Sequence, residues 1–440
     1  MIPVICTNNS LFARIETMLK KCIKDRVAVK FGQAERAMDF LSIEMPDLVI
    51  IDFSDENLDL EYLTSEIKND AWLLNSGIIG LSDSPRKLRK SEQLNGLNII
   101  ALVDYSMIEQ QFPGIVRIIW QNRRILSQRF IGADLGSNIS VSFEIHNDPV
   151  EAYCFTNLIC NFLYNLNRID NKGKDSLNVV LIELLINAIE HGNCGITFEE
   201  KSDWLNSGKE IYELIRKKCA DPEISARKVL LDYTIHPTHT SFCIKDDGNG
   251  FDWRSIKKKT QNGKLLELHG RGIPISQGIV QNLTYNDKGN SLSFDFKHQT
   301  GVANVTPALF KHLETVNVKK GEIIFREEEL SNYLYYVISG SYEVLVENIQ
   351  VSILSPDDIF IGEMSFLLNN RRSATVKALS DGSLIRITKK DFVEGIREKP
   401  HYSLFLSRLL ANRIERLNHI ISEIPAHCPQ AMPKCLKAVS

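Results

Sequence analysis

The chain has 440 residues, of which 43% are hydrophobic and 24% are charged, with a formal net charge of −3. This composition is typical of folded globular protein rather than of disordered or fibrous chains, and the length predicts two to four domains. The small net charge gives no reason to expect nucleic acid as a partner, and no apolar run reaches the roughly 18 residues that a membrane span needs. Nine scattered cysteines and a start that lacks a secretion signal predict a cytoplasmic protein with reduced thiols.

The first predicted unit, residues 1–128, alternates short apolar runs with amphipathic stretches. The apolar runs include "DLVIIDF" and "GIIGLS", and the stretches between them include "LFARIETMLKKCI" and "QAERAMDFLSI". This alternation is typical of a doubly wound α/β sheet with parallel strands. Functional groups of such sheets gather at the carboxyl ends of the strands, which is where Asp52 stands in "PDLVIIDFSDEN".

This unit resembles the receiver domain of bacterial response regulators, with Asp52 at the phosphoacceptor position and Ser82 near the hydroxyl position. The resemblance also implies an acidic pair that holds Mg²⁺, but that place reads Thr7 to Asn9. A phosphate-binding lysine is implied where Asp104 stands. Without those charges, phosphoryl transfer loses its electrostatic support. We therefore expect a degenerate pseudo-receiver used for docking or dimerisation, with a working receiver as the alternative.

The second predicted unit, residues 129–300, contains the run "ELLINAIEHGN" from Glu183 to Asn193. Glu183, Asn187 and His191 are four residues apart, so they share one face of a helix that is otherwise apolar almost all round. A buried glutamate and asparagine need partners, because each would cost several kcal/mol if left unpaired. The partners are either structural neighbours or a ligand.

Two glycine-rich motifs follow this run, "IKDDGNGFDW" and "LHGRGIPISQGIV". Glycines allow close backbone approach, and amide groups at a glycine-led helix start make a phosphate cradle. In this order, the three motifs resemble the Bergerat ATP-binding fold of the GHKL superfamily, over about residues 140–297. Within that superfamily the sequence is most similar to the anti-sigma-factor serine kinases, because of "ELLINAIEHGN" and the short "GRG".

The resemblance implies a role for each motif residue. Glu183 would be the catalytic general base, and Asn187 would hold Mg²⁺ against the phosphates. His191 would be a further ATP-binding residue of the same helix, and Asp246 would accept a hydrogen bond from the adenine amino group. The remaining ATP contacts would come from the two glycine motifs, namely from Gly248, Gly250, Gly270, Arg271 and Gly272.

Several stretches depart from the family pattern. Residues 198–228 form a charged insertion that we expect to be helical, and "KGNSLSFDF" lacks the threonine that many members have after the glycine. Lys257 to Lys259 either meet phosphate or form a solvated charge run. A histidine kinase is disfavoured, because the space before Glu183 is too short for a dimerisation hairpin. We interpret His146 as a surface or turn residue.

The third predicted unit, residues 305–425, has closely spaced strands with Gly, Asn and Asp turns, followed by a helical pattern from Lys389. This arrangement predicts a small β-barrel or β-roll with C-terminal helices. Its segment "FIGEMSFLLNNRRSATVKA" resembles the phosphate-binding cassette of cyclic-nucleotide-binding domains. The resemblance extends over about residues 310–420.

The cassette resemblance implies a ligand contact for five residues. Glu363 would accept the ribose 2′-hydroxyl, and Arg372 would pair with the cyclic phosphate through two donors. Gly362 would begin the cassette helix, and the amides of Ser373 and Ala374 would complete the anion site. The ligand would be cAMP or cGMP. The alternative is a cassette that has kept its fold and lost its ligand.

The three units predict a multidomain α/β and α+β signalling protein: a doubly wound receiver-like domain, a Bergerat α/β sandwich, and a β-roll with C-terminal helices. We expect an ATP–Mg²⁺-dependent serine/threonine protein kinase of the anti-sigma-factor type, regulated by a cyclic nucleotide. A non-catalytic, ATP-dependent partner-binding switch and, third, a histidine kinase are the alternatives. The expected partner is a protein, either an anti-sigma antagonist or a sigma-factor-like module, and neither nucleic acid nor a membrane. The C-terminal helical pattern leaves a homodimer open, and we expect residues 426–440 to be a tail rather than a metal site.

Overall fold

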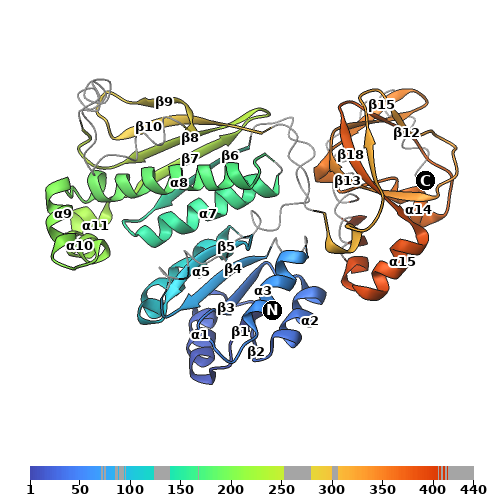
Figure 1. Ribbon diagram of the computed structural model, residues 1–440. Helices are drawn as coiled ribbons and strands as arrows, with labels where there is room; N and C mark the ends of the chain where they lie inside the picture. The colour runs from blue at the N-terminus through green and yellow to red at the C-terminus, as the bar shows by residue number, and fades with distance from the viewer. Residues whose placement is uncertain are drawn as a thin grey trace, which may run out of the picture.

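The computed structural model of the chain contains three units built on four β-sheets (Figure 1). We name them the N-terminal unit (1–122), the central unit (139–299) and the C-terminal unit (306–414). The structure describes these residues with the following exceptions: 71–72, 74–75, 85–87, 89–93, 95, 167, 252–278, 405, 408–409 and 412–413. The described residues thus comprise most of each unit, and the multidomain organisation is confirmed.

The N-terminal unit is a parallel sheet of five strands in the order β2-β1-β3-β4-β5. This is one of the common orders of doubly wound folds, in which ligand sites form at the carboxyl ends of the strands. The three interior strands, β1, β3 and β4, are buried over their whole length, which explains their continuous apolar sequence. The strands are β1 (Ile2–Ile5), β2 (Ala28–Phe31), β3 (Leu48–Asp52), β4 (Gly77–Ser82) and β5 (Ile99–Asp104), and the helices are α1 (Asn9–Cys22), α2 (Ala34–Glu44), α3 (Leu60–Asn69) and α5 (Ile108–Gln121).

The central unit is an antiparallel sheet in the order β6-β7-β8-β10-β9, with two long helices on one face (Figure 1). Strand β7 alternates strictly between buried and half-buried residues, as a sheet covered on one face requires. The strands are β6 (Ile139–Ile145), β7 (Val229–Ile235), β8 (His239–Asp246), β9 (Gln281–Tyr285) and β10 (Ser291–Lys297), and the covering helices are α7 (Pro149–Asn165) and α8 (Asn171–Asn187).

The insertion between the motif helix and the Asp246 strand is helical, as the sequence predicts. It folds into α9 (Phe198–Asn206), α10 (Ile211–Lys218) and α11 (Pro222–Ala226). Helix α10 has a strongly amphipathic sequence and buries Leu214 and Ile215. These two apolar residues join the core of the central unit, and the polar face of α10 points away from it.

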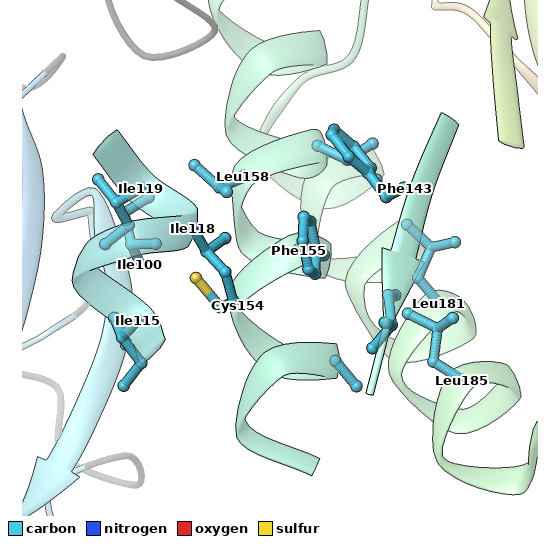
Figure 2. Packing of buried hydrophobic residues seen from close by; sticks show 14 of the residues in the cluster. Ile100, Ile115, Ile118, Ile119, Phe143, Cys154, Phe155, Leu158, Leu181 and Leu185 are labelled. Atoms are coloured by element: carbon cyan, nitrogen blue, oxygen red, sulfur yellow. The ribbon is translucent and has the colours of Figure 1, made fainter. Parts of the chain in front are cut away.

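Helix α7 is buried on two sides and joins the N-terminal and central units. One side packs on α8 and the central sheet, and the other packs on α5 and β5 (Figure 2). Cys154 and Leu158 face the isoleucines of α5, while Phe155 lies beside Phe143 of β6 with ring centroids 4.7 Å apart. One continuous apolar core thus runs through both units, although the sequence patterns indicate two separate units.

The C-terminal unit is a β-roll of two four-stranded sheets, followed by helices, and this expectation is confirmed. The first sheet has the order β11-β18-β13-β16 and the second has the order β12-β17-β14-β15. The elements are β11 (Thr315–Val318), β12 (Ile323–Phe325), β13 (Tyr333–Ser339), β14 (Tyr342–Val346), β15 (Ile349–Leu354), β16 (Phe360–Ile361), α14 (Glu363–Leu368), β17 (Thr375–Ala378), β18 (Gly382–Thr388) and α15 (Lys389–Glu398).

Across the part of the chain that the structure describes, no single helix is both long and apolar enough to cross a membrane. One bent pair, Asn171–Asn193 with Phe198–Asn206, passes the same test of length and composition with an angle of 103° between its halves.

Candidate nucleotide-binding sites

The motif helix carries two half-buried polar side chains near its C-terminal end. Glu183 and Asn187 are one helical turn apart on α8, so they share a face. Among the described residues neither side chain has a hydrogen-bond partner. Their neighbours Leu184 and Leu185 are fully buried. A half-buried carboxylate and amide without partners are groups that a ligand can satisfy.

His191 stands beyond the end of α8. From Ala188 to Asn193 the chain forms a π-helical turn. The Nδ1 of His191 lies 2.5 Å from the carbonyl oxygen of Ile196, and its ring packs on Phe198 with a centroid distance of 4.4 Å. The imidazole therefore fixes the start of the insertion. The equal spacing of four residues did not reveal this change of helix type.

The end of β8 forms the second part of the candidate ATP site. The carboxylate of Asp246 is 9% exposed and accepts a hydrogen bond of 2.8 Å from the amide of Gly248. Burial raises the pKa of Asp246 to about 6, against the lowering effects of that hydrogen bond and of Lys288. Gly192 lies against the same carboxylate, since a Cβ there would be 2.5 Å from the Cγ of Asp246. The π-helical turn and the Asp246 loop are therefore in direct contact.

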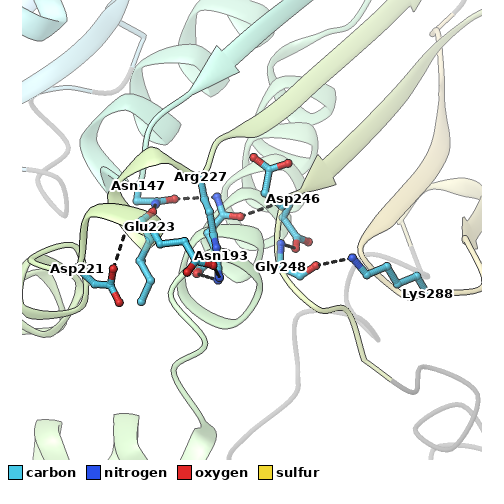
Figure 3. Close-up of polar contacts among 10 residues, drawn as sticks. Asn147, Asn193, Asp221, Glu223, Arg227, Asp246, Gly248 and Lys288 are labelled. Atoms are coloured by element: carbon cyan, nitrogen blue, oxygen red, sulfur yellow. Dashed lines mark hydrogen bonds and ion pairs between the residues drawn. The ribbon is translucent and has the colours of Figure 1, made fainter.

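Asn193 holds these two segments together. It is completely buried, and its Oδ1 accepts a hydrogen bond of 2.8 Å from the amide of Asp247 (Figure 3). Its Nδ2 donates to the Oδ1 of Asn147 at 2.8 Å, and its carbonyl oxygen accepts from Arg227 at 2.8 Å. The sequence motifs did not predict a role for Asn193. A short polar residue directly after "HG", at the end of an apolar helix, was the feature that could have indicated one.

The hairpin between β9 and β10 supports the Asp246 loop from the other side. The Nδ2 of Asn290 donates to the carbonyl oxygen of Asp246 at 2.9 Å. Lys288 donates to the carbonyl oxygen of Gly248 at 3.0 Å (Figure 3). Asn290 stands after the glycine where the family pattern has threonine, so an amide makes the supporting contact here. Gly250 has a φ of 76°, and a Cβ there would overlap the carbonyl oxygen of Lys288. Only glycine fits at this position.

The remaining predicted ATP contacts lie outside the described residues. These are Gly270, Arg271 and Gly272, and the lysine run from Lys257 to Lys259 lies outside them as well.

Asp52 in the N-terminal unit is surrounded by the protein's own side chains. Asp52 is 3% exposed and accepts a hydrogen bond from the hydroxyl of Tyr105. Burial raises the pKa of Asp52, although the hydrogen bonds from Tyr105 and Ser54 oppose it. The nearby carboxylate of Asp55 is engaged by the amide and hydroxyl of Thr7, at 2.5 Å and 2.7 Å. The Oγ of Ser82, at the end of β4, lies 3.1 Å from the Oγ of Ser54.

The cassette of the C-terminal unit is built around a buried arginine. Arg372 is 2% exposed, and its Nη1 donates to the carbonyl oxygen of Gly362 at 2.9 Å and to the Oγ of Ser365 at 3.0 Å. Its Nη2 donates to the carbonyl oxygen of Tyr333 at 2.5 Å, and the guanidinium lies 4.1 Å from the ring centroid of Phe325. The buried Nε has no hydrogen-bond partner among the described residues. Burial lowers the pKa of Arg372.

The other predicted cassette residues surround this guanidinium. Gly362 has a φ of 81°, and a Cβ there would overlap the Nη1 of Arg372, so glycine is required. Glu363 begins α14, is 6% exposed and lies close enough to Arg372 to act on its charge. Ser373 and Ala374 follow Arg372 on the way into β17. A buried cation with an unpaired N–H and an acidic neighbour fits a ligand that has both a phosphate and a hydroxyl.

No described group of three or more His, Cys, Asp or Glu side chains has the arrangement of a metal site. Asn187 supplies a side-chain oxygen of the type that Mg²⁺ prefers, and phosphate oxygens would have to complete the coordination. The residues present therefore fit a metal that arrives with a nucleotide, rather than one held by the protein alone.

Comparison with known families identifies two of the three units. Residues 216–296 match the family described as histidine kinase-like ATPase domain, and residues 315–399 match the family described as cyclic nucleotide-binding domain. The first range contains Asp246 and Gly248 and begins after α8, so Glu183 and Asn187 lie outside it.

Individual relatives share only part of the chain. An uncharacterised ABC transporter ATP-binding protein of Mycobacterium bovis is 36% identical over 86 residues, which are 18% of this chain and 26% of that protein. The CRP-like cAMP-activated global transcriptional regulator of Mycobacterium tuberculosis is 28% identical over 123 residues, 27% of this chain and 54% of that protein. A crystal structure of the Thermus thermophilus catabolite activator protein matches with 26% identity and a TM-score of 0.24, covering 26% of this chain and 55% of that one.

The chain thus spans between a quarter and about half of the length of these relatives. The family matches show which domains the chain contains. It contains a histidine kinase-like ATPase domain followed by a cyclic nucleotide-binding domain.

Proposed function

We propose that the protein is an ATP-dependent serine/threonine protein kinase of the anti-sigma-factor type, controlled by a cyclic nucleotide. The observation that carries the proposal is the joining of two polar features in the central unit. Helix α8 presents Glu183 and Asn187 and leads into Gly192, and Gly192 contacts the carboxylate of Asp246. In this proposal the general base and the adenine acceptor stand on neighbouring segments of one site.

In this proposal each residue of the ATP site has one task. The carboxylate of Asp246 accepts a hydrogen bond from the adenine amino group, and Gly248 lets the base approach the backbone. Glu183 takes the proton from a partner's hydroxyl while that oxygen bonds to the γ-phosphorus, and the bond to the leaving ADP oxygen breaks. Asn187 would hold Mg²⁺ through its amide oxygen. When bound, Mg²⁺ neutralises the charge of the transferring phosphoryl group.

The cyclic nucleotide is assigned to the cassette. Arg372 pairs with the cyclic phosphate through its Nε–H and its second Nη2–H, which is a bidentate arrangement. Glu363 accepts the ribose 2′-hydroxyl. The matched regulator of Mycobacterium tuberculosis is described as cAMP-activated, so cAMP is the first ligand to test and cGMP is the second.

A phosphoryl-transfer assay tests the kinase directly. The full chain is incubated with γ-labelled ATP, Mg²⁺ and proteins captured by pull-down, and the labelled sites are mapped. We expect label on serine or threonine of an anti-sigma-antagonist-like partner. The label should fall by about 10²–10⁴-fold in Glu183→Gln, because the general base is lost. The control Glu199→Gln alters an exposed first-turn residue of α9 and should leave the label unchanged.

The same assay separates the alternatives. Nucleotide-dependent capture of a sigma-factor-like partner without label transfer would replace the kinase by a binding switch. Label on histidine would indicate a histidine kinase. The position of His146 does not support a histidine kinase. His146 is exposed directly after β6 and is not on a helical hairpin, and its Nδ1 lies 3.0 Å from the Oε2 of Glu151. A homodimer and the identity of the partner protein remain predictions of the sequence.

A further inference from the structure

The C-terminal unit is fastened to the N-terminal unit by a buried pair. The Nε2 of His401 lies 2.8 Å from the Oδ2 of Asp70, and the two side chains are 3% and 5% exposed. Asp70 is the C-cap residue of α3, and His401 stands just after α15. Lys399 adds a half-exposed ion pair of 3.2 Å with Glu66 of α3. These contacts join residues more than 330 positions apart in the sequence.

An apolar contact accompanies the pair. Met45, the left-handed residue that ends α2, packs against the core of the C-terminal unit that contains Phe310, Tyr336 and Tyr402. Polar surface pairs alone contribute little to binding, but a buried pair flanked by apolar contact defines one orientation of its two partners. We call these contacts, made by Met45, Glu66, Asp70, Lys399 and His401, the α3 junction.

The α3 junction is connected to the cassette through two ring contacts and a shared apolar cluster. The ring of His401 lies 4.7 Å from that of Tyr402, which packs on Phe310 at 6.2 Å. The same apolar cluster includes Phe366 of α14, the cassette helix. Arg372 is bonded to that helix through Ser365. An anion bound to Arg372 therefore acts on a helix that shares its core with the residue beside His401.

On its other side the N-terminal unit is connected to the ATP helix. The side chain of Asn157 on α7 donates a hydrogen bond of 2.9 Å to the carbonyl oxygen of Ile100 in β5. Its Oδ1 accepts a hydrogen bond of 2.8 Å from Asn178 of α8, the helix that carries Glu183. Because α7 is buried on both sides, displacement of the N-terminal sheet is passed to α8 rather than absorbed by solvent.

We propose that the N-terminal unit is the mechanical link between the two nucleotide sites, and that the His401–Asp70 pair is where it receives the signal from the cyclic-nucleotide-binding domain. This inference rests on the proposed function, because it assumes that both sites bind nucleotides. It assigns the degenerate Asp52 unit a role that needs no phosphorylation. The linkage is reciprocal, so ATP also changes the affinity for the cyclic nucleotide.

The test measures the coupling factor between the two ligands in the full chain. Calorimetry gives the Kd for ATP–Mg²⁺ with and without saturating cAMP, and separately with and without cGMP. We expect at least one cyclic nucleotide to change the wild-type Kd by about 5–150-fold. In His401→Gln and in Asp70→Asn the factor should fall to within about twofold of 1, while the Kd for each ligand alone stays close to wild type.

Two further variants keep the test decisive. Lys399→Gln removes the half-exposed pair with Glu66 and should reduce the coupling factor partly. This variant keeps the inference testable if the variants of the buried pair do not fold. Asp381→Asn removes an exposed pair with Lys319 in the same unit and should leave the factor unchanged. Thermal unfolding confirms that each variant is folded.

The outcomes are distinct. A wild type that binds neither ATP nor a cyclic nucleotide contradicts the proposed function and the coupling with it. A wild type that binds both with a factor of 1 contradicts the inference alone. The inference is also contradicted if His401→Gln, Asp70→Asn and Lys399→Gln are all folded and all keep the wild-type coupling factor.

Discussion

The carbonyl oxygen of Gly192 lies against the Cα of Gly248, so closely that a Cβ on Gly248 would overlap it. Gly192 lies in the π-helical turn after α8, and Gly248 follows β8. The two glycines thus let a helix end and a strand end meet around the carboxylate of Asp246. This contact brings together motifs that are more than fifty residues apart in the sequence.

We expect Gly248→Ala to abolish ATP binding, because the added methyl group would push the Asp246 loop away from the π-helical turn. Overpacking of this kind costs about 1–3 kcal/mol. Calorimetric titration with ATP–Mg²⁺ measures the effect. The control is Gly114→Ala in α5, where a Cβ meets nothing within 4 Å. That variant should bind ATP normally and be stabilised by roughly 0.5–1 kcal/mol. Wild-type affinity in Gly248→Ala would refute the assigned contact.

The pH dependence of ATP binding should report Asp246. Its pKa of about 6 means that the carboxyl is protonated below that pH and then no longer offers the charged acceptor that we assign to adenine. The Kd for ATP should therefore rise as the pH falls through 6. Asp246→Asn should bind ATP more weakly than the wild type at pH 7. Its Kd should lack the rise that the wild-type Kd shows as the pH falls through 6. A wild-type affinity that follows the variant at every pH would exclude the adenine role.

The same group affects stability with a definite sign. The folded-state pKa of Asp246 lies above the ordinary value of 3.8, so between these values the folded state binds more protons than the unfolded state. Stability from this group then falls as the pH rises from about 4 to 6, and the burial cost is fully present above 6. Asp246→Asn should consequently raise the melting temperature of the nucleotide-free protein at pH 7 more than at pH 5. Equal changes at both pH values would contradict the raised pKa.

Loss of Arg372 should abolish cyclic-nucleotide binding. Arg372→Lys keeps a positive charge but removes the bidentate fork and the Nε–H, so the affinity for cAMP or cGMP should fall by about 30-fold or more. Arg371→Ala is the matched control. Its side chain is exposed and donates to the carbonyl oxygen of Glu328, so the affinity should stay within about twofold of wild type. Calorimetry with both ligands measures the change, and equal losses in the two variants would refute the assignment.

The shared core predicts that the N-terminal and central units unfold together. Leu158 is completely buried between the isoleucines of α5 and the helices of the central unit. Leu158→Ala should lower the free energy of unfolding by about 2–5 kcal/mol. Circular dichroism and the fluorescence of the four tryptophans should then shift to the same lower denaturant midpoint. Separate transitions would show that α7 does not join the two units.

The sequence carried the local chemistry of each unit. The alternation of apolar runs indicated parallel strands, and the structure has them. The cassette segment indicated that Gly362, Glu363 and Arg372 lie close together, and they do, while their contacts with a ligand stay predictions. Period, glycine position and charge act within a few neighbouring residues, so a sequence shows them. The equal spacing of Glu183, Asn187 and His191 predicted one α-helical face, whereas His191 stands in a π-helical turn. Its contact with the carbonyl oxygen of Ile196 depends on how the chain turns after that segment, and residue spacing does not show this turn.

Long-range partners were decided only by the folded structure. The burial of α7 on two sides, the role of Asn193 and the His401–Asp70 pair each depend on segments distant in the chain. A single sequence shows that a residue is apolar or polar, and it does not show which distant residue will cover it. The sequence by itself therefore determined which elements each unit contains and which polar residues lie close together within it. The tertiary structure decided how the units are joined, because burial and hydrogen-bond partners exist only once distant segments meet.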